Sequence, residues 1–220
     1  MMNKLKAVGQ LTNFRKSHEY QGRNGKTVEY YKADLAVQRL SDYHDYIPLV
    51  ISDDVLGSLD VENVVRVCVE GELRTRNYTG IDGKSHLAVY VKATSIVGVA
   101  DNTEDSNEVE FEGVLCKQPT LRTTDTSRVI SDLLIAHNVR SKKGYRTKSY
   151  YVPALTWGSS AKAAHSRLKI GDSVLVKGRL QSRKYHCKND PEGVIHWAYE
   201  ISVSDFQADN TEDESDNNVA

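Results

Sequence analysis

Aromatic side chains mark one strand-like segment of the sequence, residues 151–157, as a candidate binding surface. Side chains alternate between the two faces of a strand, so Tyr151 and Trp157 share one face and the even-numbered residues between them share the other. An exposed ring can stack on a nucleic-acid base, which is worth about 1–3 kcal/mol per base and favours single strands because duplex bases are already stacked. The alternative interpretation is that both rings pack in a core.

Basic residues are concentrated within nine positions just before this segment: Arg140, Lys142, Lys143, Arg146 and Lys148. Tyr145 lies among them. The cations would neutralise phosphates, and the Tyr145 ring would offer a further stacking surface. A charge run is usually a solvated loop. The position of this run beside the aromatic segment favours phosphate binding.

One motif occurs twice, in residues 71–78 and 178–185, with glycine, leucine, a hydroxyl residue, arginine and tyrosine at the same spacing. Tyr78 and Tyr185 end the two copies and are further stacking candidates. Four basic residues of the two copies would extend the phosphate track: Arg74, Arg76, Arg183 and Lys184. Trp197 and Tyr199 alternate with apolar residues and are expected in the core.

This motif is part of a longer internal repeat. Residues 8–11, 33–37, 46–48 and 71–78 match residues 112–115, 131–135, 151–153 and 178–185 in the same order. Matches in a conserved order indicate a duplicated unit. The first unit carries an acidic and aromatic loop, residues 41–46, in place of the basic loop. That loop is expected either to stack bases through Tyr46 or to pack against a neighbour, because Asp42 and Asp45 repel phosphate.

Each unit has the pattern of several short strands. Apolar residues alternate with others in residues 65–69 and 87–93, as in half-buried strands. Gly25 follows Asn and Gly83 follows Asp, which is typical of hairpin turns. A helix is predicted over residues 160–168, and its counterpart in the first unit is expected to be shorter or absent. The sequence therefore predicts an all-β fold with short helices: two tandem OB-fold five-stranded barrels.

Acidic residues are concentrated in two segments, 101–110 and the tail after residue 206, which are expected to be solvated and disordered. The predicted domains are residues 1–100, a linker over 101–108, residues 109–207 and a tail over 208–220. Residues 1–100 carry 13 basic and 12 acidic side chains, whereas residues 111–206 carry 16 and 8. The second unit thus carries nearly all of the positive field that attracts a polyanion.

Several classes of function find no support in the sequence. Cys68, Cys116 and Cys187 form no closely spaced pair and are expected to be reduced. Scattered histidines and the lack of a phosphate loop or nucleophile motif predict no enzyme, no metal and no cofactor. No apolar stretch reaches the roughly 18 residues of a membrane span, and the first residues lack a signal-peptide core. A soluble, cytoplasmic protein is therefore expected.

Residues 151–158, 168–176 and 178–185 together resemble the bacterial single-stranded-DNA-binding family. The shared pattern is an aromatic strand ending in an aromatic residue and glycine, a helix, a turn with lysine and glycine, and the repeated motif. The resemblance implies single-stranded DNA binding, independent of sequence, in DNA replication, repair or recombination. The first unit has Ser52 in place of Trp157, which implies a weaker or accessory DNA surface there.

The resemblance also bears on assembly and partners. Family members assemble four OB-folds, so a chain with two implies a homodimer. The family's acidic tail ends in a hydrophobic tip that docks replication or repair proteins, whereas residues 216–220 contain no aromatic side chain. The tail thus departs from the family pattern at the part that recruits such partners. Two alternatives stay open: an interaction scaffold in which only the second unit binds nucleic acid, and a single-stranded RNA binder.

Overall fold

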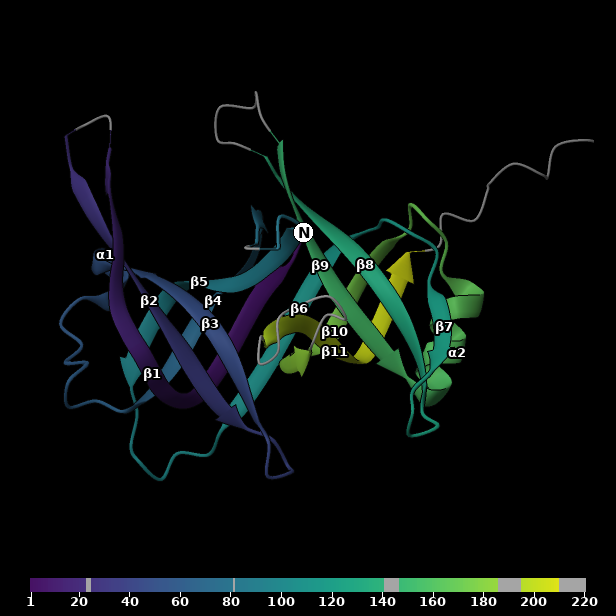
Figure 1. Ribbon diagram of the computed structural model, residues 1–220, viewed down its shortest axis with the longest axis horizontal. Helices are drawn as coiled ribbons and strands as arrows, with labels where there is room; N and C mark the ends of the chain where they lie inside the picture. Colours follow the sequence, from purple (N-terminus) through teal and green to yellow (C-terminus); the bar gives the residue numbers. More distant parts are fainter. Residues whose placement is uncertain (23–24, 81, 141–146, 186–194, 210–220) are drawn as a thin grey trace, which may run out of the picture.

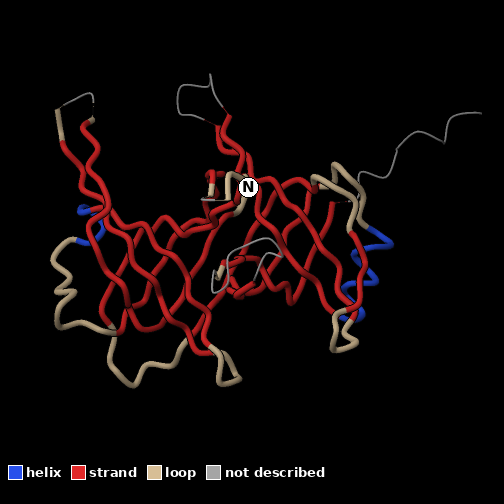
Figure 2. The backbone as a smooth tube through the Cα atoms, in the orientation of Figure 1, coloured by secondary structure: helices blue, strands red, loops and turns tan. Residues whose placement is uncertain are grey.

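The computed structural model describes residues 1–22, 25–80, 82–140, 147–185 and 195–209, and most of them lie in strands (Figure 1, Figure 2). The first half contains β1 (Asn3–Gln21), β2 (Thr27–Gln38), β3 (His44–Ser52), α1 (Asp53–Leu56), β4 (Arg66–Thr79) and β5 (Ser85–Gly98). The second half contains β6 (Ser106–Leu115), β7 (Thr120–Thr123), β8 (Val129–Arg140), β9 (Thr147–Trp157), α2 (Gly158–Arg167), β10 (Ser173–Tyr185) and β11 (His196–Asp209).

Each half closes into a ring of five strands. In the first half β1 pairs with β2 and β4, β3 pairs with β2 and β5, and β4 pairs with β5. In the second half β6, β8, β9, β11 and β10 repeat this arrangement. The pairings of β3 with β5 and of β9 with β11 are parallel and short. The predicted all-β fold on five-stranded barrels is confirmed, with β7 as an extra strand beside β8.

Equivalent glycines in β1 and β6 make the duplication visible in the packing. A Cβ atom on Gly9 would collide with the Ala36 carbonyl of β2, and a Cβ atom on Gly113 would collide with the Ala136 carbonyl of β8. Only glycine lets the first strand of each barrel approach its neighbour so closely. The two halves thus share one packing arrangement, as expected for a duplicated unit.

The structure shifts the repeat in one segment. Ala36 pairs with Tyr46, and Ala136 pairs with Tyr151 in the same way. Residues 33–37 therefore correspond to residues 133–137, two positions later than the residues 131–135 matched in the sequence. An error of two residues leaves every side chain on its expected face, because the side chains of a strand alternate with a period of two.

The two barrels are joined edge to edge through their first strands. Residues 3–8 of β1 pair antiparallel with β6, which links both barrels in one eleven-stranded sheet. The disorder expected for the acidic segment 101–110 is wrong for its second part, because β6 begins at Ser106. Just before it, Asp105 forms an ion pair with Arg66. The paired cation offsets part of the repulsion on which the expectation of disorder was based.

Other local expectations fare differently. Gly25 and Gly83 have φ angles of 77° and 73°, as the predicted turns require. Helix α1 has only four residues, as expected, while α2 begins two residues before its predicted start and has no side-chain cap. Cys68 and Cys116 are free thiols, and Cys187 lies outside the described residues. Within the described ranges no helix is long and apolar enough to cross a membrane.

Aliphatic side chains fill both barrels from alternate positions of the strands. Buried residues of the first barrel include Leu5, Leu35, Ile47, Leu73 and Val91. Buried residues of the second barrel include Phe111, Ile135, Val152, Leu180 and Ile201. The intervening positions of the same strands form the outer faces. The filled interiors leave no room for a ligand, so the outer faces and the loops are the surfaces that a ligand can reach.

Candidate nucleic-acid interface

Strand β9 carries the predicted stacking residues of the second half. Its even-numbered residues from 152 to 156 are buried, as predicted, whereas Tyr151 is 47% exposed and Trp157 is partly exposed. Leu155 departs from the expected alternation, because it is buried too. The indole Nε1 of Trp157 donates a hydrogen bond of 3.1 Å to Ser202 Oγ on β11. Neither predicted ring is enclosed in the barrel.

The basic loop before β9 is described only at its two ends. Arg140 ends β8 and Lys148 lies near the start of β9, and both are exposed. The Lys148 Nζ lies 5.0 Å from the centre of the Tyr150 ring. The other predicted residues of the loop lie outside the described residues: Lys142, Lys143, Tyr145 and Arg146. Their contact with phosphate stays a prediction.

Two arginines on the outer face of the second barrel form ion pairs. Arg183 lies 3.3 Å from a carboxylate oxygen of Glu200, and Arg122 lies 2.6 Å from one of Asp132. A phosphate would have to compete with a carboxylate for each of these guanidinium groups. Lys184 differs, because its Nζ lies 5.2 Å from the centre of the Trp197 ring.

Arg74 is a contact between the two halves. Its side chain is only 14% exposed and pairs with Glu72. Its guanidinium carbon lies 4.4 Å from the centre of the Tyr150 ring in the second half. This cation–π contact leaves little of the guanidinium for a phosphate. Arg76, two residues later, is exposed.

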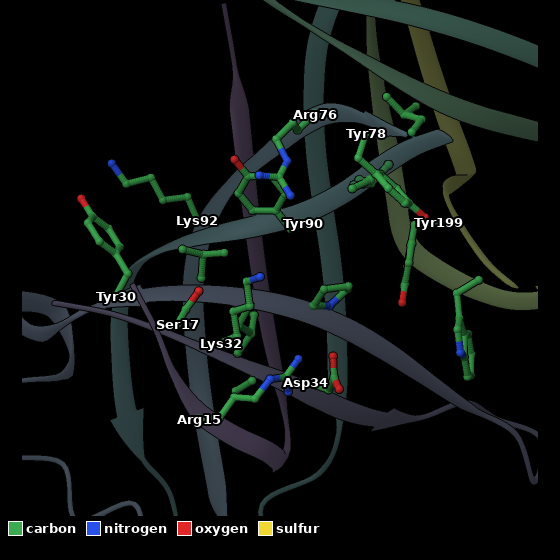
Figure 3. Close-up of a pocket in the computed structure, with 18 of the residues that line it drawn as sticks. Arg15, Ser17, Tyr30, Lys32, Asp34, Arg76, Tyr78, Tyr90, Lys92 and Tyr199 are labelled. Carbon is green, nitrogen blue, oxygen red and sulfur yellow. The ribbon is translucent and has the colours of Figure 1, made fainter. Parts of the chain in front are cut away.

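A cleft of about 650 Å³ lies between the outer face of the first barrel and the start of β11 (Figure 3). Four exposed cations from four strands line it: Arg15, Lys32, Arg76 and Lys92. In the part of the chain that the structure describes, none of the four forms an ion pair with a carboxylate. Among the described residues that line the cleft, Asp34 carries the only carboxylate, so the charge of this described lining is positive.

Aromatic rings line the same cleft: Tyr30, Tyr78, Tyr90, Trp197 and Tyr199. The core prediction for Trp197 is wrong, because the first residues of β11 extend past their barrel in a hairpin with β10 and face the first half. The Trp197 ring meets the Tyr46 ring edge to face, with centres 5.5 Å apart. Tyr199 does pack against the core. Burial, with a contribution from the Asp34 charge, raises the pKa of Tyr199 to about 12.

Four stacked or tilted rings connect the halves at one end of the cleft. Tyr78 stacks on His86 at 5.5 Å, and His86 stacks on His196 at 5.3 Å. Tyr185 lies against the same His196, with centres 5.3 Å apart. The two copies of the repeated motif thus bring their final tyrosines into one ladder. Tyr78 keeps 42% of its surface exposed.

Several cleft residues were not predicted from the sequence: Arg15, Tyr30, Lys32, Tyr90 and Lys92. Lys32 and Lys92 are each next to a buried residue in a strand, Ala33 and Val91. The alternation that identified the buried faces also marks these outward positions. Alternation does not predict which outward faces come together in a cleft, because the cleft combines strands that are distant in the sequence.

Asp45 of the acidic loop lies at the contact between the halves and is 1% exposed. Its carboxylate accepts hydrogen bonds from Arg39 Nη2 at 2.6 Å and Arg179 Nη1 at 2.7 Å. Arg39 Nε donates a third, at 3.1 Å, and the backbone N–H of Ser182 donates a fourth, at 2.7 Å. Of the two outcomes expected for this loop, packing against a neighbour is the one observed for Asp45, and the neighbour is the second barrel. The negative charge of Asp45 is therefore paired with the two arginines and is not a free anion at the cleft.

Comparisons with known proteins agree with this architecture. The model described as "Single-strand binding protein family" matches residues 106–209. The chain is similar to single-stranded DNA-binding protein 3 of Clostridium acetobutylicum, with 28% identity over 46% of this chain and 69% of that protein. A single-stranded DNA-binding protein of Caldanaerobacter subterraneus is 31% identical over 46% of this chain and 66% of its own length. One from Clostridium tetani is 27% identical over 38% of this chain and 58% of its own length.

A solved structure matches both halves together. The single-stranded DNA binding protein from Thermus aquaticus superposes with a TM-score of 0.69, covering 94% of this chain and 93% of that chain. The sequence identity is 19%. At this identity the likeness establishes the fold, and it extends the comparison to the first half, which lies outside the family-model match.

Proposed function

Because the chain belongs to the single-strand binding protein family, we propose that it binds single-stranded DNA by base stacking and phosphate contacts, with no strict sequence requirement. The observation that carries the proposal is the cleft, in which four exposed cations and five aromatic rings converge. Cations that no carboxylate neutralises are free to release counterions from a polyanion. The first half is therefore a principal part of the site.

The bound strand would continue from the cleft over the β10–β11 hairpin towards β9. Tyr46 and Lys184 both lie against the Trp197 ring at this crossing. The backbone N–H of Tyr151 donates a hydrogen bond of 3.1 Å to Thr75 Oγ1, on the strand that carries the cleft cation Arg76. The exposed Tyr151 ring is thus the next stacking surface, with Arg140 and Lys148 as phosphate contacts beyond it.

We further propose a non-catalytic role in DNA replication, repair or recombination in the cytoplasm, with the chain acting as a homodimer. A dimer would combine four barrels, the number on which the family's assembly is built. The scaffold alternative requires a first half that does not bind nucleic acid. The unpaired cations of the cleft argue against it.

Titration of the intrinsic tryptophan fluorescence tests the proposal. Stacking of two bases, at about 1–3 kcal/mol each, favours a single strand over a duplex by at least about 30-fold in affinity. We expect oligo(dT) to quench the emission at concentrations at which duplex DNA of the same length has no effect. Equal affinity for the duplex would contradict the stacking model. Tighter binding of oligo(U) than of oligo(dT) would identify an RNA binder instead.

A further inference from the structure

Asp34 is the one carboxylate among the described residues of a cleft that otherwise carries positive charge. It lies on β2, two residues after the cleft cation Lys32, and is partly exposed. Figure 3 shows Asp34 among the residues that line the cleft. A carboxylate at this place repels phosphate and lowers the affinity for any polyanion. A different role is needed to explain a carboxylate there.

The carboxylate of Asp34 is held in place from the neighbouring strand. Asn13 Nδ2 donates a hydrogen bond of 2.8 Å to Asp34 Oδ2. Asn13 has a φ of 54° and lies where the pairing of β1 with β2 shifts register between Thr12 and Arg15. Irregular strand positions of this kind redirect side chains, and asparagine tolerates the left-handed backbone better than most residues.

One oxygen of the carboxylate is left for a ligand. Asn13 occupies Oδ2, and the backbone oxygen of Asp34 accepts from Thr12 Oγ1 at 3.1 Å. In the described part of the chain no donor occupies Oδ1. The rings of Tyr30, Tyr90 and Trp197 line the same cleft. A base stacked on one of these rings would therefore lie in the same cleft as the Asp34 carboxylate.

We propose that Asp34 accepts a hydrogen bond from the exocyclic amino group of a bound base, so that the cleft prefers cytosine, adenine or guanine to thymine. Cytosine, adenine and guanine each present an exocyclic amino donor. The only donor of thymine is the ring N3–H, which lies between two carbonyl oxygens that the carboxylate repels. Asn13 acts as the positioning residue. The inference rests on the proposed single-strand binding and adds a base preference to it.

Competition between oligo(dC) and oligo(dT) of about 16 nucleotides tests the proposal. The quantity measured is the ratio of the two dissociation constants in each variant, since differences in strand stiffness cancel between variants. We expect Asp34→Ala to reduce the preference for oligo(dC) roughly five- to tenfold and to tighten oligo(dT) binding. Asp34→Asn should give a preference between those of the unmodified chain and Asp34→Ala. Asn13→Gly, in which the left-handed backbone conformation stays accessible, should weaken the preference in part.

Asp42→Ala is the matched control, because it removes the same charge from an exposed position in the loop before β3. Its preference should equal that of the unmodified chain. The inference is overturned if Asp34→Ala keeps the original ratio, or if Asp42→Ala changes the ratio as much. If the unmodified chain binds no oligonucleotide at all, the proposed function itself is refuted. That outcome differs from an unchanged ratio, which refutes only the base preference.

Discussion

Replacing Arg15, Lys32, Arg76 and Lys92 together by glutamine is expected to lower the affinity for oligo(dT) roughly a thousandfold at about 0.05 M salt and little at about 1 M. Each phosphate contact of a single strand contributes about 0.7 to the slope of log affinity against log salt, so four contribute roughly 2.8. The four side chains line one cleft and form no ion pair in the described chain. Binding titrations at several salt concentrations measure the effect.

A charge-matched variant separates the cleft from the general field of the protein. Four exposed cations on and around α2 serve this purpose: Lys117, Lys162, Arg167 and Lys169. Their replacement by glutamine changes the net charge equally and should leave the slope within about one contact of the original. Equal losses in both variants would contradict a site in the cleft, since they would show that only total charge matters.

Asp45→Ala is expected to lower the free energy of unfolding by about 3 kcal/mol, because it leaves two guanidinium groups and an amide without their shared acceptor. The value lies at the low end for a broken buried pair, since Arg39 and Arg179 are 25% and 37% exposed and water can reach them. For a chain of this length the melting temperature should fall by about 6–12 °C. Calorimetry at neutral pH measures the change.

Asp42→Ala provides the comparison for this variant too, because Asp42 is exposed and lies three residues earlier in the same loop. Its substitution should change the stability by less than about 0.5 kcal/mol. A loss of less than about 1 kcal/mol in Asp45→Ala would contradict the interpretation that this carboxylate holds the halves together.

Local patterns predicted the barrels well. Alternation and turn glycines are patterns of residues that are close in the sequence. The strands and the turns at Gly25 and Gly83 that they predict are present in the structure. The acidic segment 101–110 was harder to interpret from its composition. Its second part pairs with β1, whose residues lie about a hundred positions earlier, and composition contains no information on such a partner.

The candidate site was predicted only in part, for a related reason. Tyr46, Tyr78, Tyr185 and Lys184 do gather around Trp197 and His196. A count of charges favoured the second half, and such a count does not reveal that Arg183 on β10 lies against Glu200 on the neighbouring strand β11. A cation contributes to an interface only when no carboxylate is folded against it, and that depends on tertiary structure.

The most direct test of the cleft uses the two tryptophans one at a time. Trp157→Phe leaves Trp197 as the only tryptophan of the chain, and Trp197→Phe leaves Trp157. Because Trp197 lines the cleft and Trp157 lies on the second barrel, each variant reports on one surface. We expect oligo(dT) to quench the emission of Trp197 in the first variant. Replacing the four cleft cations by glutamine in that variant should abolish the quenching at low salt. Unchanged Trp197 emission at concentrations that quench Trp157 would contradict the account, because the strand would then bypass the cleft.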